Sequence, residues 1–287
     1  MTRIVYVNGR YVPYAQAAVH VEDRGFQFAD AIYEVCEVRG GRLVDEARHM
    51  ARLERSLGEL QIRQPMSAAA LGFVMRQVVR RNRVRDGLVY LQVSRGADPR
   101  EFYFPGPDVS PTVVCLARPA SRAGLEARAE VGIPVKSMPD IRWQRCDIKT
   151  VMLLPACLAK EAARKEGARE AWFVDASGFV TEGASSNAWI VDGEGSVITR
   201  QLGSDILPGV TRATLLDTLA EEKVRLIERP FLLTEAYAAR EAFITSATQT
   251  VMPVVRIDGR PVGDGKPGSV VQRLRKKFHH FAAISSV

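Results

Sequence analysis

The 287-residue sequence has few cysteines and no long apolar run, and each shortage excludes a class of protein. No two of the four cysteines form a Cys-x-x-Cys pair, so the pattern indicates neither a zinc site nor a dithiol redox motif, and we expect no metal. We expect reduced, mostly buried, structural thiols at Cys36, Cys115, Cys146 and Cys157, as in a cytoplasmic protein. No apolar window is long enough to span a membrane, and the first residues, MTRIVYVNGRYVPY, lack the apolar core of a signal peptide.

Basic residues exceed acidic ones by 40 to 33, which gives a formal net charge of +7. Part of the excess lies in two clusters, Arg76–Arg85 and Arg273–His280. Such clusters can bind nucleic acid, and a nucleic-acid-binding protein is the alternative of a different class. We favour solvated cations near helix C-termini, because no aromatic interleaving or RNA-binding motif accompanies them. We therefore expect no nucleic acid and no membrane as partners.

The patterning predicts a mixed α+β protein of two domains. Asn8-Gly9 and Gly40-Gly41 lie between strand-forming residues and predict two β-hairpins. Apolar periodicity and strand-forming runs predict further elements, with helices over 45–60, 71–82, 153–167, 209–223 and 270–281 and strands within 87–96, 112–119, 170–199 and 242–250. The helical periodicity breaks at Ala117–Glu126, so we expect a small N-terminal domain over 1–118, a linker over 119–125 and a larger C-terminal domain over 126–287.

Lys149, in RCDIKTVMLL, is the first candidate for chemistry. It is either a solvated side chain or an amine held in a pocket. A lysine amine is protonated near neutral pH, but partial burial favours its neutral form, which condenses with an aldehyde. By itself this signal is weak, because most lysines lie on the surface.

Glu182 lies in a second candidate segment, GFVTEGASSNAWIV. A buried carboxylate needs a partner, and a protonated pyridine nitrogen is one that would keep the ring an electron sink. The alternative is a turn glutamate followed by ordinary turn formers, Ser186 and Asn187 among them.

Three further positions could hold a phosphate. Val210 and Thr211 open a predicted helix whose free N–H groups can bind an anion. Ala247 and Thr248 could add an N–H and a hydroxyl from a turn, and Arg52 could add a charged fork. Each is weak alone, since many helices begin this way without a ligand and Arg52 by itself is typical of a helix surface.

The order of these segments resembles class IV (fold-type IV) aminotransferases, which use pyridoxal 5'-phosphate. The resemblance covers about residues 3–275 and is most specific in VTEGASSNAW combined with RCDIK. It is carried by DRGFQFADAIYEV, HMARLERS, RCDIKTVMLL, VTEGASSNAW, LPGVTR and TSAT. Within the family the sequence is most similar to D-amino acid aminotransferases, because Ser-Ser-Asn stands where the branched-chain L-amino acid enzymes usually have Gly-Glu-Asn.

The resemblance implies a fold and a set of roles. Two α/β domains would hold the cofactor between them, usually in a homodimer. Lys149 would carry the cofactor as a Schiff base and move the proton, and Glu182 would pair with the pyridine nitrogen. The phosphate would be held by Arg52 and by the turns at Val210-Thr211 and Ala247-Thr248. Tyr33 would face the substrate, and Ser186 and Asn187 would belong to the cofactor site.

One loop departs from the family. D-amino acid enzymes typically carry Arg-x-His there, whereas PREFYFP has Arg100 and then Phe102. Arg100 can still bind an α-carboxylate through two hydrogen bonds, but Phe102 cannot donate one. Losing one neutral hydrogen bond costs about 0.5–1.5 kcal/mol, roughly tenfold at most.

We therefore expect transamination between a D-amino acid and a 2-oxo acid. An (R)-selective amine transaminase, as a side or main activity, is the alternative that Phe102 suggests. The same fold also supports branched-chain L-amino acid transamination and 4-amino-4-deoxychorismate lyase activity. The lyase fits less well, because the retained Arg100 indicates binding of an amino acid carboxylate.

Overall fold

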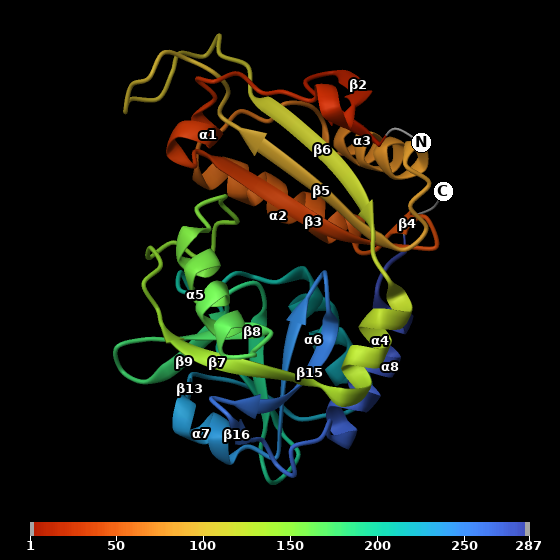
Figure 1. The fold of residues 1–287 in the computed structure, drawn as a ribbon, viewed down its shortest axis with the longest axis vertical. Coiled ribbons are helices and arrows are strands. Elements are labelled where there is room, and N and C mark those ends of the chain that lie inside the picture. Colours follow the sequence, from red (N-terminus) through yellow and green to blue (C-terminus); the bar gives the residue numbers. More distant parts are fainter. Residues whose placement is uncertain (1–2, 285–287) are drawn as a thin grey trace. The chain divides into compact units, whose positions relative to one another are not determined.

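A computed structural model describes residues 3–284, and this part of the chain divides into two compact units (Figure 1). Unit 1 contains the residues up to Arg122 together with Ile148–Met152 and the last described residues, Ala283 and Ile284. Unit 2 contains Ala123–Asp147 and Leu153–Ala282. The chain thus enters unit 2 within the predicted linker 119–125, returns to unit 1 for five residues, and then completes unit 2.

Unit 1 is built on a six-stranded sheet. Asn8 and Gly9 both have positive φ (44° and 88°), as a two-residue hairpin turn requires, and Gly40 and Gly41 do the same in the second hairpin (59° and 81°). Both predicted hairpins are present. The order of the strands is β2 (Arg10–Pro13), β1 (Ile4–Val7), β6 (Thr112–Pro119), β5 (Gly87–Ser94), β3 (Ala31–Arg39) and β4 (Arg42–Leu43).

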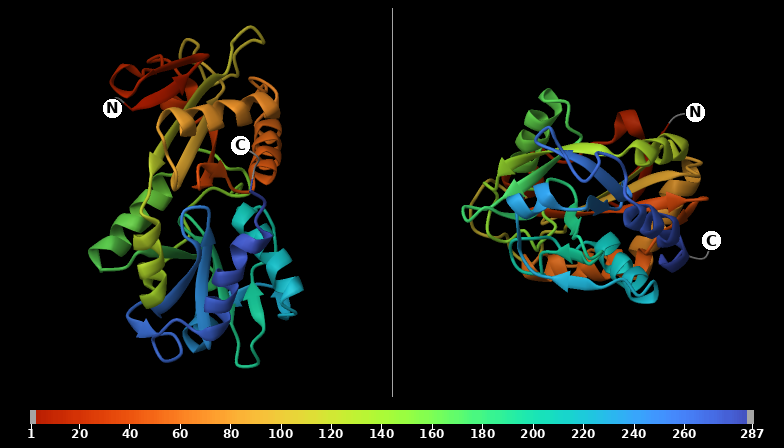
Figure 2. Two further views of the ribbon diagram at one scale, coloured as in Figure 1. Left: turned by 90° about the vertical axis from the view of Figure 1, so that its right-hand side faces the viewer. Right: turned by 90° about the horizontal axis from the view of Figure 1, so that it is seen from below.

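Two helices cover one face of this sheet (Figures 1 and 2). Helix α2 (Glu46–Glu59) packs on β3, and Met50, Leu53 and Leu57 of its predicted apolar stripe are buried. Helix α3 (Ala68–Arg81) packs on β6, β1 and β5. The short helix α1 (Arg24–Phe28) precedes β3, and the 3₁₀ turn η1 (Tyr14–Gln16) follows β2.

Unit 2 is built on a ten-stranded mixed sheet. Its apolar core includes Trp172, Phe231 and Ile244. The path through the sheet runs β12 (Leu226–Glu228), β11 (Val197–Thr199), β10 (Asn187–Val191), β14 (Glu241–Ser246), β15 (Thr250–Ile257), β7 (Ile133–Pro139), β8 (Glu170–Val174), β9 (Phe179–Gly183) and β13 (Phe231–Leu232), with β16 (Arg260–Pro261) paired to β15.

The helices of unit 2 pack on this sheet. These helices are α4 (Arg122–Val131), α5 (Leu154–Lys165), α6 (Val210–Glu221), α7 (Leu233–Ala238) and α8 (Ser269–Phe281). Helix α6 contacts α8 and β14, α8 contacts β15, and α5 lies on β8. Both units therefore mix helices and strands, as predicted, and no helix within residues 3–284 is long and apolar enough to cross a membrane.

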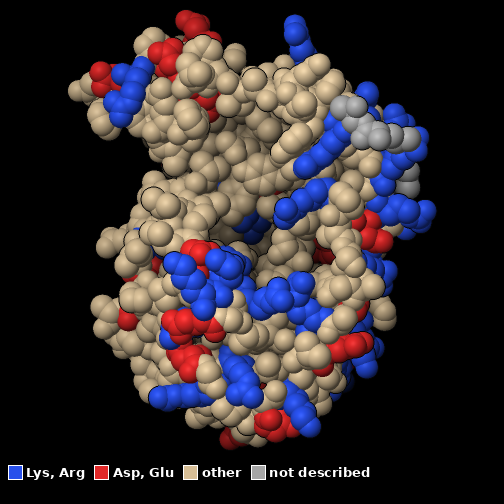
Figure 3. Space-filling model, viewed as in Figure 1, with Lys and Arg blue, Asp and Glu red and all other residues tan. Residues whose placement is uncertain are grey.

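Both basic clusters reach a helix C-terminus, as predicted. Arg80 and Arg81 lie in the last turn of α3, and the second cluster runs along α8 from Arg273 to His279 and His280 in its last turn. Arg275 there bonds to Glu126 and to two backbone carbonyls. On the face of unit 2 seen in Figure 3, acidic residues lie among the basic ones. This face of unit 2 thus carries interspersed charges of both signs rather than a basic stripe.

Candidate active site

Lys149 lies on a short irregular segment that bonds to β3 of the sheet in unit 1, not at a helix start. Its carbonyl accepts from the Tyr33 N–H (3.0 Å), the Val151 N–H donates to the Ala31 carbonyl (3.0 Å), and its own N–H donates to Ser56 Oγ (3.4 Å). The lysine is half-buried, and Nζ lies 4.2 Å from the centre of the Tyr33 ring. These backbone hydrogen bonds therefore fix the position from which the Lys149 side chain extends.

Tyr33 belongs to the half-exposed face of β3, which continues across β5. Its ring stacks on that of Tyr90 with 5.6 Å between centroids, and Tyr90 Oη donates to Gln92 Oε1 (2.7 Å). Burial raises the pKa of Tyr90 to about 12, so its hydroxyl stays protonated at neutral pH. The face beside the Lys149 amine thus carries two phenols and an amide, of which the sequence resemblance assigned only Tyr33 to the substrate side.

The Arg52 guanidinium is bonded to the carboxylate of Glu34, a residue that the sequence analysis did not identify. Glu34 is fully buried, and it accepts from Arg52 Nε (2.8 Å) and Nη2 (2.7 Å). His49 Nδ1 lies 2.7 Å from the same carboxylate. Burial alone would raise the pKa of Glu34, but the charge and hydrogen bonds of Arg52 and the hydrogen bond with His49 outweigh it and lower the pKa to about 2.

His49 behaves as a neutral partner in this cluster. Its burial lowers the pKa of the imidazole, although the bond to Glu34 opposes the shift. A neutral ring bonded to a carboxylate carries its proton on the bonded nitrogen, so Nδ1 donates to Glu34. Arg52 is therefore not a solvated helix residue, since its side chain is 9% exposed and its fork is fixed on Glu34.

Glu182 lies inside β9 in unit 2 and is 5% exposed. Arg142 Nη1 donates to its Oε1, and Oε2 accepts from Asn187 Nδ2 (3.1 Å) and from the Leu207 N–H (3.1 Å). Arg142 is itself fixed by two bonds to Asp140, at 2.9 and 2.7 Å. The carboxylate is thus buried, surrounded by donors and rigid, which favours the functional interpretation over a turn residue.

Asn187 connects Glu182 to the start of α6. Its amide also donates to the Leu207 carbonyl (2.9 Å), and a Cβ on Gly209 would stand 2.1 Å from its Oδ1. Gly209 is the N-cap residue of α6, so Val210 and Thr211 open the helix as predicted. The helix N-terminus and the Glu182 carboxylate therefore share one support within unit 2.

The other predicted residues of unit 2 are less closely tied to Glu182. Ser186 is buried and donates to Glu170 Oε2 (3.2 Å). Ala247 and Thr248 form the turn between β14 and β15, where the hydroxyls of Ser246 and Thr248 lie 3.2 Å apart. Ser186 therefore supports a strand end, and the turn presents a hydroxyl at the surface.

Arg100 and Phe102 lie on the loop between β5 and β6 in unit 1. The Arg100 guanidinium lies 5.0 Å from the Phe28 ring centre and 5.7 Å from that of Phe102, and the two rings are 5.6 Å apart. Phe102 thus does more than add apolar area, because it flanks the arginine that the sequence resemblance assigns to the carboxylate.

The four cysteines are free thiols, but only two of them are buried, whereas the sequence led us to expect mostly buried thiols. Cys36 and Cys115 are buried, Cys146 is half-buried and Cys157 is exposed. Burial raises the pKa of Cys146 to about 12, so it is not a thiolate nucleophile near neutral pH.

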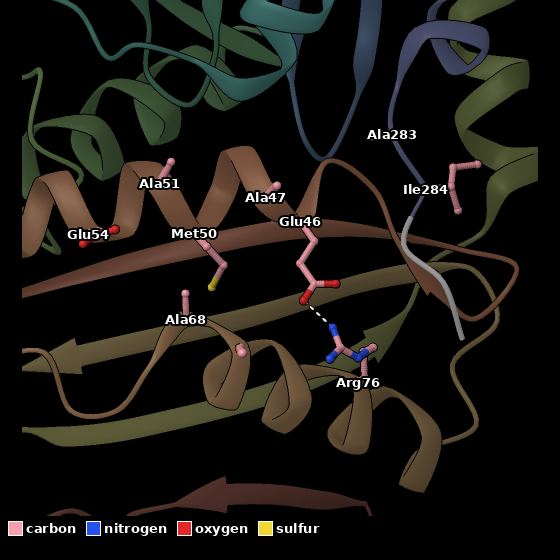
Figure 4. Close-up of a pocket in the computed structure, with 10 residues that line it drawn as sticks. Glu46, Ala47, Met50, Ala51, Glu54, Ala68, Arg76, Ala283 and Ile284 are labelled. Atoms are coloured by element: carbon pink, nitrogen blue, oxygen red, sulfur yellow. Dashed lines mark hydrogen bonds and ion pairs between the residues drawn. The ribbon is translucent and has the colours of Figure 1, made fainter.

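A separate cavity of about 630 Å³ opens between α2 and α3 in unit 1 (Figure 4). It is lined by small and apolar side chains such as Ala47, Met50 and Ala68, with the Glu46–Arg76 ion pair on one side. None of the predicted site residues lines it, and Arg52 of α2 is bonded to Glu34 of β3 instead.

Comparison with known proteins shows which family and which relatives the chain resembles. The family model described as amino-transferase class IV matches residues 31–257. The D-alanine aminotransferase of Staphylococcus haemolyticus is 36% identical over 277 residues, which are 96% of this chain and 97% of that protein. That of Bacillus licheniformis is 36% identical over 271 residues, 94% of each chain.

Solved structures share the fold. A hypothetical aminotransferase from Mycobacterium tuberculosis, in its PLP-bound form, superposes with a TM-score of 0.85 at 18% identity, over 97% of this chain and 98% of that one. The branched-chain amino acid aminotransferase of Escherichia coli gives a TM-score of 0.86 at 23% identity, over 97% and 94%. At these identities the likeness shows the fold alone.

A half-buried lysine amine and a buried, arginine-held carboxylate, one in each unit of a mixed fold, are groups that an enzyme transferring amino groups needs. The match over most of the chain makes the assignment specific: the chain belongs to the amino-transferase class IV family. It is a pyridoxal-phosphate-dependent aminotransferase, as the sequence resemblance indicated.

Proposed function

We propose that the protein transfers the amino group of a D-amino acid, such as D-alanine, to a 2-oxo acid. The observation that carries this proposal is the guanidinium of Arg100, which is exposed and flanked by Phe28 and Phe102 rather than bound to an acidic residue in the described structure. A cation presented in this way suits an α-carboxylate. The similarity to D-alanine aminotransferases over nearly the whole chain supports the same substrate class.

The groups present fit pyridoxal phosphate. The bound cofactor would supply an aldehyde and an electron-accepting ring. Toward it the chain offers an amine at Lys149, a buried carboxylate at Glu182 and the N–H groups at the start of α6. Arg52 would add positive charge, with its Nε and Nη2 already bonded to Glu34. Glu182 is already surrounded by donors, so it would stay ionised and hold a proton on the ring nitrogen.

The remaining residues take roles around the substrate and the phosphate. Lys149 would bind the aldehyde carbon and afterwards carry the proton to and from the substrate α-carbon. Tyr33, against which the amine rests, would limit the directions from which that proton is delivered. Ala247 and Thr248 would add an N–H and a hydroxyl to the phosphate, and Ser186 and Asn187 would support the cofactor side of unit 2.

We also propose a homodimer. Large apolar side chains are exposed on α1 and on the loop after β5: Phe26 (76%), Phe102 (76%), Tyr103 (81%) and Phe104 (57%). A group of exposed aromatic residues is typical of a surface that another chain covers. A second copy is the occupant that the family resemblance favours. The cytoplasmic location stays a prediction from the free thiols.

A half-reaction tests the substrate class. Holoenzyme is mixed separately with D-alanine, L-leucine and (R)-1-phenylethylamine, and the loss of the cofactor's visible absorbance is followed. We expect D-alanine to react fastest. A faster reaction with L-leucine would instead support branched-chain transamination, and a faster reaction with the amine would support the (R)-amine activity that Phe102 suggests.

A further inference from the structure

The loop that carries Arg100 has an unusual support. Residues 98–111 between β5 and β6 contain no helix or strand (Figure 1). Most of their side chains are exposed. Two arginines nevertheless contact this loop from the protein side, Arg24 at 4% exposure and Arg95 at 8%. Since exposed loops without a backbone ladder are normally mobile, buried cations beneath one require an explanation.

Arg24 holds the loop at the residue between Arg100 and Phe102. Its Nη1 donates to the carbonyl of Glu101 (2.6 Å), while its Nε donates to Asp30 Oδ2 (2.9 Å). Its guanidinium also lies 4.7 Å from the Phe28 ring centre, the ring that Arg100 approaches to 5.0 Å. One buried arginine therefore fixes both the backbone beside Arg100 and the ring against which Arg100 rests.

Arg95 holds the same loop farther along. Its guanidinium lies 3.6 Å from the centre of the Phe104 ring. Its Nε and Nη2 donate to Asp30 Oδ2 (2.7 Å) and Oδ1 (3.0 Å), and two further bonds reach the Gln61 and Leu60 carbonyls after α2. The Asp30 side chain, 10% exposed, is thus shared by both arginines.

We propose that Asp30, Arg24 and Arg95 form a clamp that positions the Arg100 loop and thereby sets the preference for substrates with a carboxylate. The inference rests on the proposed function of Arg100. Without Asp30, the two buried guanidinium groups would have no shared anion between them. Each would then lose the bond that orients it toward the loop, at the Glu101 carbonyl for Arg24 and at the Phe104 ring for Arg95. Ordering a mobile loop during binding costs free energy and so weakens the affinity for the substrate. A loop that the clamp already holds in place avoids this cost, so the clamp acts through preorganisation.

The test compares Asp30→Asn with Arg24→Lys, which keeps the cation but cannot bond Asp30 and the Glu101 carbonyl as a fork. Arg63→Gln is the matched control, because Arg63 contacts the far end of the same loop, at the carbonyls of Pro107 and Val109, and lies outside the clamp. Both clamp variants should raise the KM for D-alanine about tenfold or more, with kcat much less affected. kcat/KM for (R)-1-phenylethylamine should change less than about threefold, and the control should resemble wild type on both substrates.

Amide hydrogen exchange provides the readout that does not depend on activity. Exchange over residues 100–104 in the holoenzyme should be faster in both clamp variants than in wild type or Arg63→Gln. Unchanged exchange there, or an equal loss on both substrates, would overturn the clamp. If wild type does not use D-alanine at all, the proposed function fails, and the exchange measurement still decides whether the clamp holds the loop.

Discussion

Glu34 stands on the buried face of β3, in register with Ile32, Cys36 and Val38, where an ionised carboxylate needs a cationic partner. Arg52 supplies that partner from α2, and His49 adds a neutral donor. The signal was present in the sequence, since an ionisable residue in the apolar phase of an alternating strand is uncommon. Which helix would pack on that face could not be read from the sequence, so the pair was missed.

The low pKa of Glu34 predicts how stability depends on pH. The carboxyl has a pKa of about 2 in the folded protein against an ordinary 4.5, so its contribution is complete above 4.5 and is lost as the pH falls toward 2. Between pH 5 and 3 the free energy of unfolding should fall about 2 kcal/mol more in wild type than in Glu34→Gln. Urea unfolding at each pH measures this difference.

Glu59→Gln is the control for this measurement, because Glu59 is on the same helix as Arg52 but is partly exposed and pairs with Arg55 at 3.9 Å. Its pH dependence should match wild type. Parallel curves for wild type and Glu34→Gln would show that Glu34 is not ionised against Arg52.

Glu182 is the residue whose charge the chemistry most requires. Glu182→Gln should retain the cofactor but slow transamination about ten- to a hundredfold, because a neutral amide cannot hold the ring nitrogen protonated. Stopped-flow half-reactions with D-alanine measure this loss. Glu228→Gln removes another arginine-paired carboxylate of unit 2, on Arg212, and should react like wild type. A Glu182→Gln enzyme of normal rate would remove this residue from the mechanism.

Secondary structure elements were predictable wherever local rules governed them. The hairpins at Asn8-Gly9 and Gly40-Gly41, the stripe of α2 and the start of α6 all follow from turn chemistry or periodicity. The five-residue segment Ile148–Met152 did not, because its position comes from backbone bonds to β3, more than a hundred residues earlier. Short segments whose partner is distant carry little signal of their own.

The start of α6 requires a glycine at position 209, because a Cβ there would collide with Asn187. Gly209→Ala would press on Asn187 Oδ1 and displace the amide that bonds Glu182. We expect a loss of about 1–3 kcal/mol in unfolding free energy and weaker cofactor binding. Gly58→Ala is the control, because nothing lies within 4 Å of a Cβ there and the site is in α2, where alanine should stabilise slightly. Equal stability of wild type and Gly209→Ala in urea would contradict the packing argument.

At the scale of the whole molecule, the two-domain α/β fold and the family could be predicted from motifs in series along the chain. The predicted borders 1–118 and 126–287 differ from the units in one respect that concerns chemistry. Lys149 was expected in the larger domain and is grouped with Tyr33 and Arg52 in unit 1, whereas Glu182 lies in unit 2. The sequence-based prediction assigned residues to domains by their order along the chain. It could not predict that Ile148–Met152 returns to bond with β3 of unit 1.

The homodimer is testable in solution. Light scattering should give twice the chain mass of 31.7 kDa for the holoenzyme. Phe26→Ser combined with Tyr103→Ser should weaken the dimer, because both side chains are largely exposed in the single chain. Phe73→Ser, at 55% exposure on α3, is the control and should leave the mass unchanged. An active monomer would contradict the dimer.

Lys149 is the residue on which the proposed chemistry depends, and borohydride reduction of the holoenzyme followed by tryptic mapping tests it most directly. A pyridoxyl adduct on Lys149 blocks cleavage there, so the modified peptide should run from Cys146 to Lys160. Lys149→Ala should abolish the adduct, while Lys160→Gln, at the other lysine of that peptide, should keep it. An adduct on a different lysine, or a purified protein that takes up no cofactor, would contradict the assignment of Lys149.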